Sequence, residues 1–196
     1  PAKMDEIMAV CDKHQAVLIE DAAEALSAEY KGKKCGLFGK YGILSFNGNK
    51  IITTSGGGML LTKSKEDRDK ALSWSTQARE KAPWYQHTEL GYNYRMSNVA
   101  AGIGRGQLKH IEEHWELKQN IYLRYKEEFR DIPVTMNPFS EDSRPNYWLS
   151  AITVNEEAMC VQNRTDTSTT WVHEPGKSCP DEIESELAKN NIDLTL

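Results

Sequence analysis

Apolar residues near the start of the chain follow first a helical and then a strand-like spacing. Between Met4 and Cys11 they recur every three or four positions, which predicts an amphipathic helix over about residues 3–14. The short apolar run 16–19 comes next and is typical of a buried parallel strand. A helix and a strand in this order indicate an α/β protein.

Helices and strands continue to alternate through the middle of the chain. We predict a hairpin or loop at 30–34, a strand at 41–46, and a strand pair formed by 51–54 and 59–62 around a glycine turn. A helix at 65–75 and a loop over 77–96 follow. The rest of this region is predicted to form a helix from an N-cap at Ser97 to Ile111, a charged helix over 112–129 and a strand at 147–154.

The hydrophobic pattern weakens between Met159 and Lys177, where polar residues dominate. This composition predicts a loop or disordered segment over 159–177, followed by a helix that begins at Pro180. We therefore expect a large domain over residues 1–111. A small C-terminal domain over 112–196 would contain the irregular segment.

Composition narrows the class of protein. The formal charge of −5 argues against a general attraction to nucleic acid or to anionic membranes. No run approaches the roughly 18 apolar residues of a membrane span, and the chain opens on a polar sequence rather than a signal peptide. The four cysteines form no C-x-x-C pair, which favours free thiols, a cytoplasmic location and no metal site.

Lys50 is the first candidate for chemistry because of its surroundings. It lies in a polar turn between two apolar runs, with Ser45 before it and three glycines at 56–58 after it. A lysine in a polar loop is in most proteins a solvated surface charge. Its amine can also form a Schiff base with an aldehyde cofactor and then move protons as a general base.

Two acids and a hydroxyl supply the context that such a cofactor needs. Asp21 follows an apolar strand, where open α/β sheets build ligand sites, and its carboxylate could hold a pyridine nitrogen protonated. Glu24 could hydrogen-bond a phenolic oxygen, and Ser45 could hold a phosphate. The alternatives are a helix cap for Asp21, a surface acid for Glu24 and an ordinary strand residue for Ser45.

The segment 91–97 gathers an amide, a guanidinium and aromatic rings. Asn93 and Arg95 could contact a phosphate or substrate across a subunit interface, or the segment could be a plain covering loop. His87 and Tyr85 are weaker candidates for a substrate pocket. The glycines 56–58 do not match the nucleotide phosphate loop and are better explained as a turn.

Taken together, these segments resemble the DegT/DnrJ/EryC1/StrS family of sugar-nucleotide aminotransferases, which depend on pyridoxal phosphate. The matching segments are 19–25, 45–54, 56–59 and 91–97. The resemblance extends to about residue 155 and lapses over 159–177. It implies the aspartate-aminotransferase fold (pyridoxal phosphate type I), with a truncated large domain and a small C-terminal lobe, in a fragment that lacks the N-terminal part.

The resemblance also implies a role for each candidate residue. Lys50 would carry the cofactor and move the proton, while Asp21 would face the pyridine nitrogen and Glu24 the phenolic oxygen. Ser45 would bind the phosphate. Asn93 would reach the phosphate of the partner subunit's cofactor, which makes the expected active unit a homodimer.

The implied reaction transfers an amino group from glutamate to a nucleotide sugar. The acceptor would be the 4-keto carbon of a 4-keto-6-deoxy sugar, of the UDP-N-acetylhexosamine type, used for surface polysaccharide biosynthesis. One alternative is an inactive remnant or a fragment that binds a partner. Another is a pyridoxal phosphate enzyme that acts on an amino-cyclitol or an amino acid.

Overall fold

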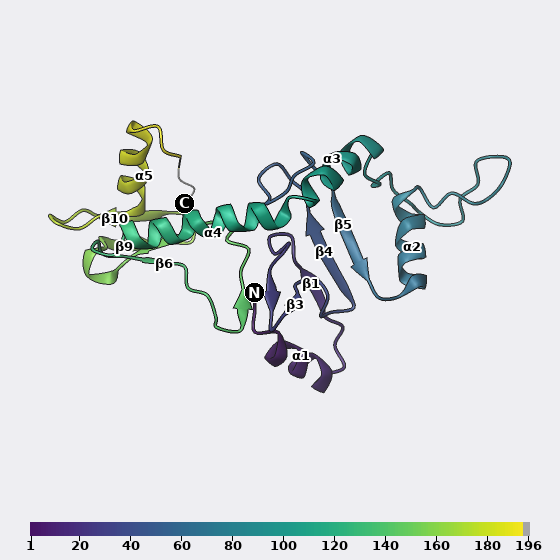
Figure 1. The fold of residues 1–196 in the computed structure, drawn as a ribbon, viewed down its shortest axis with the longest axis horizontal. Coiled ribbons are helices and arrows are strands. Elements are labelled where there is room, and N and C mark those ends of the chain that lie inside the picture. The colour runs from purple at the N-terminus through teal and green to yellow at the C-terminus, as the bar shows by residue number, and fades with distance from the viewer. Residues whose placement is uncertain (194–196) are drawn as a thin grey trace. The chain divides into compact units, whose positions relative to one another are not determined.

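The computed structural model describes residues 1–193 and separates the chain into two compact units (Figure 1). The first unit comprises residues 1–120 and 139–148, and the second comprises the rest of the described chain. The boundary lies within helix α4 (Ile111–Glu128), whereas the sequence predicts domains that meet at residue 111. The functional assignment of the two units stays a prediction.

A mixed three-stranded sheet forms the centre of the first unit. Its order is β1 (Ile19–Asp21), β4 (Tyr41–Ser45) and β5 (Gly58–Thr62), with β1 parallel and β5 antiparallel to β4 (Figure 1). The predicted α/β class and the strand at 41–46 are confirmed. The predicted buried strand at 16–19 shares only Ile19 with β1, and residues 16, 17 and 19 are exposed. Asp21 is the last residue of β1.

Alternation along β4 separates the two faces of this sheet. Leu44 is buried with Ala22, Phe46 and Ile52 in the main hydrophobic cluster of the unit. The neighbouring Ile43 points to the opposite face and is exposed. Because side chains alternate with a period of two, one face carries the core and the other lies open.

Three helices of the first unit confirm the helical periodicity of the sequence. They are α1 (Met4–Lys13), α2 (Lys65–Ser75) and α3 (Asn98–Leu108). The Ser97 hydroxyl accepts the backbone N–H of the third helical residue at 3.2 Å, as expected of an N-cap. The α3 helix ends at Leu108, three residues earlier than predicted, and α4 begins at Ile111.

The predicted strand at 51–54 is wrong, because β5 pairs with β4 instead. Ile52 is buried in the core, but the backbone around it finds partners outside any sheet. The Thr54 N–H donates to the carbonyl of Phe46 at 2.9 Å, and the Gln107 side chain binds Thr53. An apolar run alone could not distinguish this buried irregular segment from a strand.

A small antiparallel sheet completes the first unit. The predicted hairpin is confirmed as β2 (Glu29–Tyr30) and β3 (Lys33–Lys34), with Gly32 at a positive φ of 77° in the turn. The strand β7 (Ser143–Arg144) pairs with the other edge of β2. The sequence did not predict β7, since a two-residue strand carries no periodicity.

Two short antiparallel strands open the second unit. They are β6 (Val134–Met136), which the sequence did not predict, and β8 (Ile152–Val154). The strand predicted over 147–154 is therefore confirmed only in its last three residues. Tyr147 adopts a left-handed backbone with φ of 53°, which is incompatible with a continuous strand there.

The structure differs from the prediction of an irregular segment over 159–177. A 3-10 turn (Glu156–Ala158) leads into an antiparallel hairpin of β9 (Val161–Arg164) and β10 (Thr169–Val172). Most of its side chains are exposed on both faces, so the backbone ladder forms without an apolar pattern in the sequence. The predicted final helix is confirmed as α5 (Pro180–Lys189).

No helix in the described part of the chain combines the length and the apolar character that crossing a membrane requires.

Candidate cofactor site

The register of the central sheet assigns neighbouring acids to different faces. Asp21 pairs with Ile43 across the parallel β1–β4 ladder, so both side chains lie on the open face. Ser45, two residues beyond Ile43, lies on the same face. Glu20 pairs with Gly42 and faces the opposite, buried side. The open face therefore gathers a carboxylate and a hydroxyl at the carboxyl ends of two parallel strands.

Glu20 has a structural role that the sequence analysis missed. Its carboxylate accepts the backbone N–H groups of Gly36 at 2.7 Å, Phe38 at 2.5 Å and Gly39 at 2.7 Å. These donors belong to the loop before β4. Glu20 thus fixes this loop by three hydrogen bonds, and Asp21 takes no part in them.

Lys50 lies in a defined environment rather than in open solvent. Its side chain is only 11% exposed, and its Nζ lies 3.1 Å from Glu24 Oε1. The ring of Trp148 lies beneath the same amine, with its centroid 4.2 Å from Nζ. Trp148 is itself held by a hydrogen bond of 2.7 Å from its indole N–H to the carbonyl of Asn49.

The backbone of Glu24 is fixed by a buried amide. The side chain of Asn146 donates to the carbonyl of Glu24 at 2.7 Å and to that of Leu26 at 3.0 Å. Since Asn146 also receives the N–H of Trp148, it connects both partners of Lys50. The sequence offered only one signal for this arrangement, which is the run Asn-Tyr-Trp at 146–148 after a proline.

The segment that follows Lys50 is clamped to helix α3 and α4. The Gln107 side chain accepts the N–H of Thr53 at 3.0 Å and donates to its carbonyl at 2.5 Å. The ring of His114 lies 3.2 Å from the carbonyl of Ile51. These contacts satisfy backbone groups that a strand would otherwise pair, and they limit the movement of the turn that carries Lys50.

Removing this clamp is expected to destabilise the first unit. Gln107→Ala leaves the N–H and carbonyl of Thr53 without their partners, which should cost about 1–3 kcal/mol of unfolding free energy. Urea unfolding followed by circular dichroism measures the change. Alanine at the exposed Gln162 is the control, with an expected effect within about 0.5 kcal/mol. Equal values for the two variants would contradict the clamp.

Among residues 1–193, the side chains of Asp21 and Ser45 form hydrogen bonds only with backbone groups two positions away. One Asp21 oxygen accepts the N–H of Ala23 at 3.1 Å, as in an Asx turn, and the side chain is exposed. The Ser45 hydroxyl accepts the N–H of Asn47 at 3.3 Å. Both groups are accessible for further hydrogen bonds at the same end of the sheet as the turn that bears Lys50.

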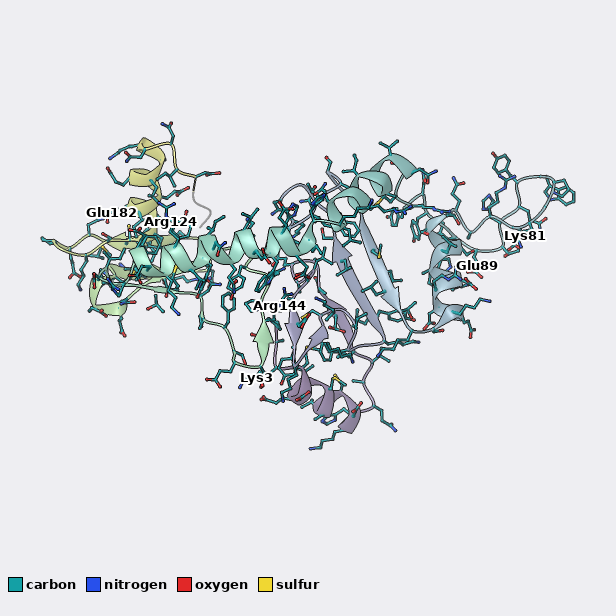
Figure 2. The ribbon with its side chains drawn as sticks, in the orientation of Figure 1. Lys3, Lys81, Glu89, Arg124, Arg144 and Glu182 are labelled. Atoms are coloured by element: carbon teal, nitrogen blue, oxygen red, sulfur yellow. The ribbon has the colours of Figure 1, made fainter. Side chains whose placement is uncertain are left out.

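The remaining candidates lie on the loop 77–96, beyond α2 (Figure 1). His87 and Tyr85, the weaker candidates for a substrate pocket, contact other residues of this loop. His87 Nδ1 lies 2.8 Å from the Gln77 carbonyl, and the Arg79 guanidinium stacks over the Tyr85 ring. Figure 2 labels Lys81 on the same loop. The structure therefore does not bring His87 and Tyr85 to Lys50 within the first unit.

Asn93 and Arg95 lie where the same loop returns to the sheet. Asn93 pairs through its backbone with Thr76, and its side chain is exposed, as is that of Arg95. Met96 anchors the end of the loop against the main hydrophobic cluster. The exposed amide of Asn93 is thus presented from an anchored segment.

The described side chains fit pyridoxal phosphate in kind. The chemistry of the cofactor calls for an amine, a carboxylate for the ring nitrogen and hydroxyl or amide donors for the phosphate. Lys50 and Glu24 already lie in contact, and Asp21 and Ser45 point from the open face of the sheet. These residues would hold the cofactor at the carboxyl ends of β1 and β4.

Comparisons with known sequences agree with this chemistry. The profile of the DegT/DnrJ/EryC1/StrS aminotransferase family matches residues 1–173. EpsN of Bacillus subtilis strain 168, provisionally named a pyridoxal phosphate-dependent aminotransferase, is 48% identical over 79% of this chain and 40% of its own length. GDP-perosamine synthase of Vibrio cholerae is 37% identical over 76% of this chain and 40% of its own. The chain thus spans about 40% of the length of these curated relatives.

A solved structure supports the expected fold. The aminotransferase from Psychrobacter cryohalolentis superposes with a TM-score of 0.76 at 27% sequence identity. The match covers 98% of this chain and 50% of that protein. The α/β arrangement described above is therefore about half of an aminotransferase structure, as the sequence predicted.

Proposed function

Because the chain belongs to the DegT/DnrJ/EryC1/StrS aminotransferase family, we propose that it carries the cofactor-binding lysine of a sugar-nucleotide aminotransferase. The observation that supports this most is the environment of Lys50, which is held between Glu24 and Trp148. An ordinary surface lysine would be mostly exposed.

We propose that the reaction moves an amino group from glutamate to the 4-keto carbon of a nucleotide-linked 4-keto-6-deoxy sugar. The name of the Vibrio cholerae relative supports a nucleotide sugar as the substrate class. The segment 45–50, Ser-Phe-Asn-Gly-Asn-Lys, resembles the branch of the family that acts on UDP-linked N-acetylhexosamines. The product would enter surface polysaccharide biosynthesis.

Each residue of the site has a proposed task. Pyridoxal phosphate, when bound, withdraws electrons from the substrate carbon and so makes its proton easier to remove. Lys50 Nζ takes that proton and returns it, a type of transfer that contributes about 10²- to 10⁴-fold in rate. Asp21 keeps a pyridine nitrogen protonated, and Ser45 donates to the phosphate. Glu24 would form a hydrogen bond with the phenolic oxygen of the cofactor ring, and it positions Nζ of Lys50.

Trp148 extends the site beyond the residues that the sequence suggested. Its ring covers Lys50 Nζ and limits the access of water to the amine. Low water access keeps a moved proton from exchanging with solvent during the reaction. We propose that the exposed side chain of Asn93 binds the phosphate of the partner subunit's cofactor in a homodimer.

Adding pyridoxal phosphate to the purified chain tests the proposal. We expect an absorption band of a lysine-bound cofactor that shifts when glutamate is added. UDP- and GDP-linked 4-keto-6-deoxy sugars, and free 2-oxo acids, are then offered as amino acceptors. Amination of the UDP-linked sugar supports the proposal, and amination of 2-oxo acids alone contradicts the substrate class. If no band forms, the chain is a remnant without cofactor chemistry.

A further inference from the structure

Three side chains of the kinds that bind metals meet in the second unit. Ligand atoms of Cys160, His173 and Glu182 all lie within 4.8 Å of one another. We propose that these residues form a zinc site with a thiolate, an imidazole and a carboxylate ligand. The sequence predicted no metal site, because these ligands lie far apart along the chain and include no closely spaced cysteine pair.

The fold explains why residues so far apart in sequence come together. Val161 pairs with Val172 at the base of the β9–β10 hairpin, so the flanking Cys160 and His173 lie opposite each other. The N–H of Cys160 donates to the Ser178 carbonyl at 3.1 Å, which brings the start of α5 to the same place. Glu182 is the third residue of that helix (Figure 2).

The contacts of Glu182 are those of a metal-binding carboxylate. Its Oε2 accepts the backbone N–H of Cys179 at 3.1 Å, and its Oε1 lies 2.7 Å from His173 Nδ1. A zinc ion would take the place of the proton between Glu182 Oε1 and His173 Nδ1, while the backbone hydrogen bond orients Oε2.

The geometry needs only a small adjustment to accept the ion. Tetrahedral zinc with ordinary bond lengths places its sulfur and nitrogen ligands about 3.5 Å apart. The side chains of His173 and Glu182 are 63% and 44% exposed, so both can rotate toward the buried Cys160. A fourth position would stay open to water, as in three-ligand zinc sites.

A purely structural explanation accounts for only part of this cluster. Glu182 caps α5, and His173 pairs with it as many surface residues do. Neither role involves the thiol of Cys160. A thiolate with an imidazole and a carboxylate is a combination that favours zinc over magnesium or calcium.

The second unit also has reason to use a metal. Among the described residues, its buried hydrophobic side chains are Tyr122, Cys160 and Cys179. Cys160 is one of the proposed ligands, and Cys179 donates its backbone N–H to another, Glu182. Zinc would fasten the β9–β10 hairpin to α5.

Metal titration of the full chain, first stripped with a chelator, tests the proposal. We expect one zinc ion per chain by equilibrium dialysis and mass spectrometry. Cobalt in its place should show thiolate charge-transfer absorption and the visible bands of a tetrahedral ion. His173→Ala and Glu182→Gln should each weaken zinc binding at least about tenfold, and Cys160→Ser should remove the thiolate band.

His110→Ala is the matched control. His110 also faces a glutamate, with its Nδ1 3.0 Å from Glu113 Oε2, and this pair belongs to the first unit. Within the described chain, no third metal-binding side chain joins the pair. Zinc affinity should be unchanged in this variant. Because His173 and Glu182 are on the surface, their variants should keep the wild-type circular dichroism. Zinc binding equal to wild type in His173→Ala, cobalt without a thiolate band, or no bound zinc would each overturn the proposal.

Discussion

Lys50→Ala is expected to abolish the cofactor chemistry while leaving the fold intact. The variant loses the amine that bonds to the cofactor, so the absorption band of lysine-bound pyridoxal phosphate should be absent. Any transamination rate should fall by about 10²- to 10⁴-fold or more. The lost ion pair with Glu24 has one largely exposed partner, so stability should change by less than about 1 kcal/mol.

Lys40→Ala is the control for this change. Lys40 lies just before β4, and its Nζ is 3.5 Å from Asp67 on the surface. Its removal should leave the absorption band and the rate unchanged. A Lys50→Ala protein that still shows the band would mean that another amine carries the cofactor.

Glu20→Ala is expected to cause the largest loss of stability of any single change considered. Three backbone N–H groups, at positions 36, 38 and 39, lose the acceptor that satisfies them. A buried donor without a partner costs about 1–3 kcal/mol, so the loss should reach about 3–5 kcal/mol. That is a large fraction of the stability of an ordinary domain, and urea unfolding measures it.

Two further variants isolate the cause. Glu66→Ala on the first turn of α2 removes an exposed acid and should change stability by no more than about 0.5 kcal/mol. Glu20→Gln keeps the shape and one acceptor oxygen, so its loss should lie between the two. If Glu20→Ala unfolds at the same urea concentration as Glu66→Ala, the three hydrogen bonds do not hold the loop.

Helices were the most predictable part of this fold. The helices α1, α2 and α5 follow their predicted ranges closely. Apolar residues at helical spacing indicated α1, and Pro180 in the first turn indicated the start of α5. The strand predicted at 51–54 failed for a physical reason. Its partners are a glutamine side chain and a carbonyl distant in sequence, which no local pattern reveals.

The same limit applies to the second unit. The β9–β10 hairpin contains many polar residues, such as Gln162 and Thr170, and its backbone ladder is joined by side-chain hydrogen bonds such as that between Thr165 and Ser168. Composition therefore indicated a loop. Short strands such as β6 depend on which segment lies beside them, and that is decided by tertiary contacts.

The candidate residues could be named from the sequence, and their roles stay predictions. Lys50, Asp21, Glu24 and Ser45 were named from spacing, and the structure places Lys50 against Glu24. The distinction between Glu20 and Asp21 became visible only through the register of β1 on β4. Trp148 was missed because it reaches Asn49 across 99 positions of sequence.

The measurement that tests the central claim most directly is chemical trapping of the cofactor on this chain. The purified protein is incubated with pyridoxal phosphate, reduced with borohydride, digested and mapped by mass spectrometry. The account predicts that the phosphopyridoxyl group is found on the peptide that contains Lys50, and on that residue. A label on any other lysine, or none at all under conditions where the chain is folded, would contradict it.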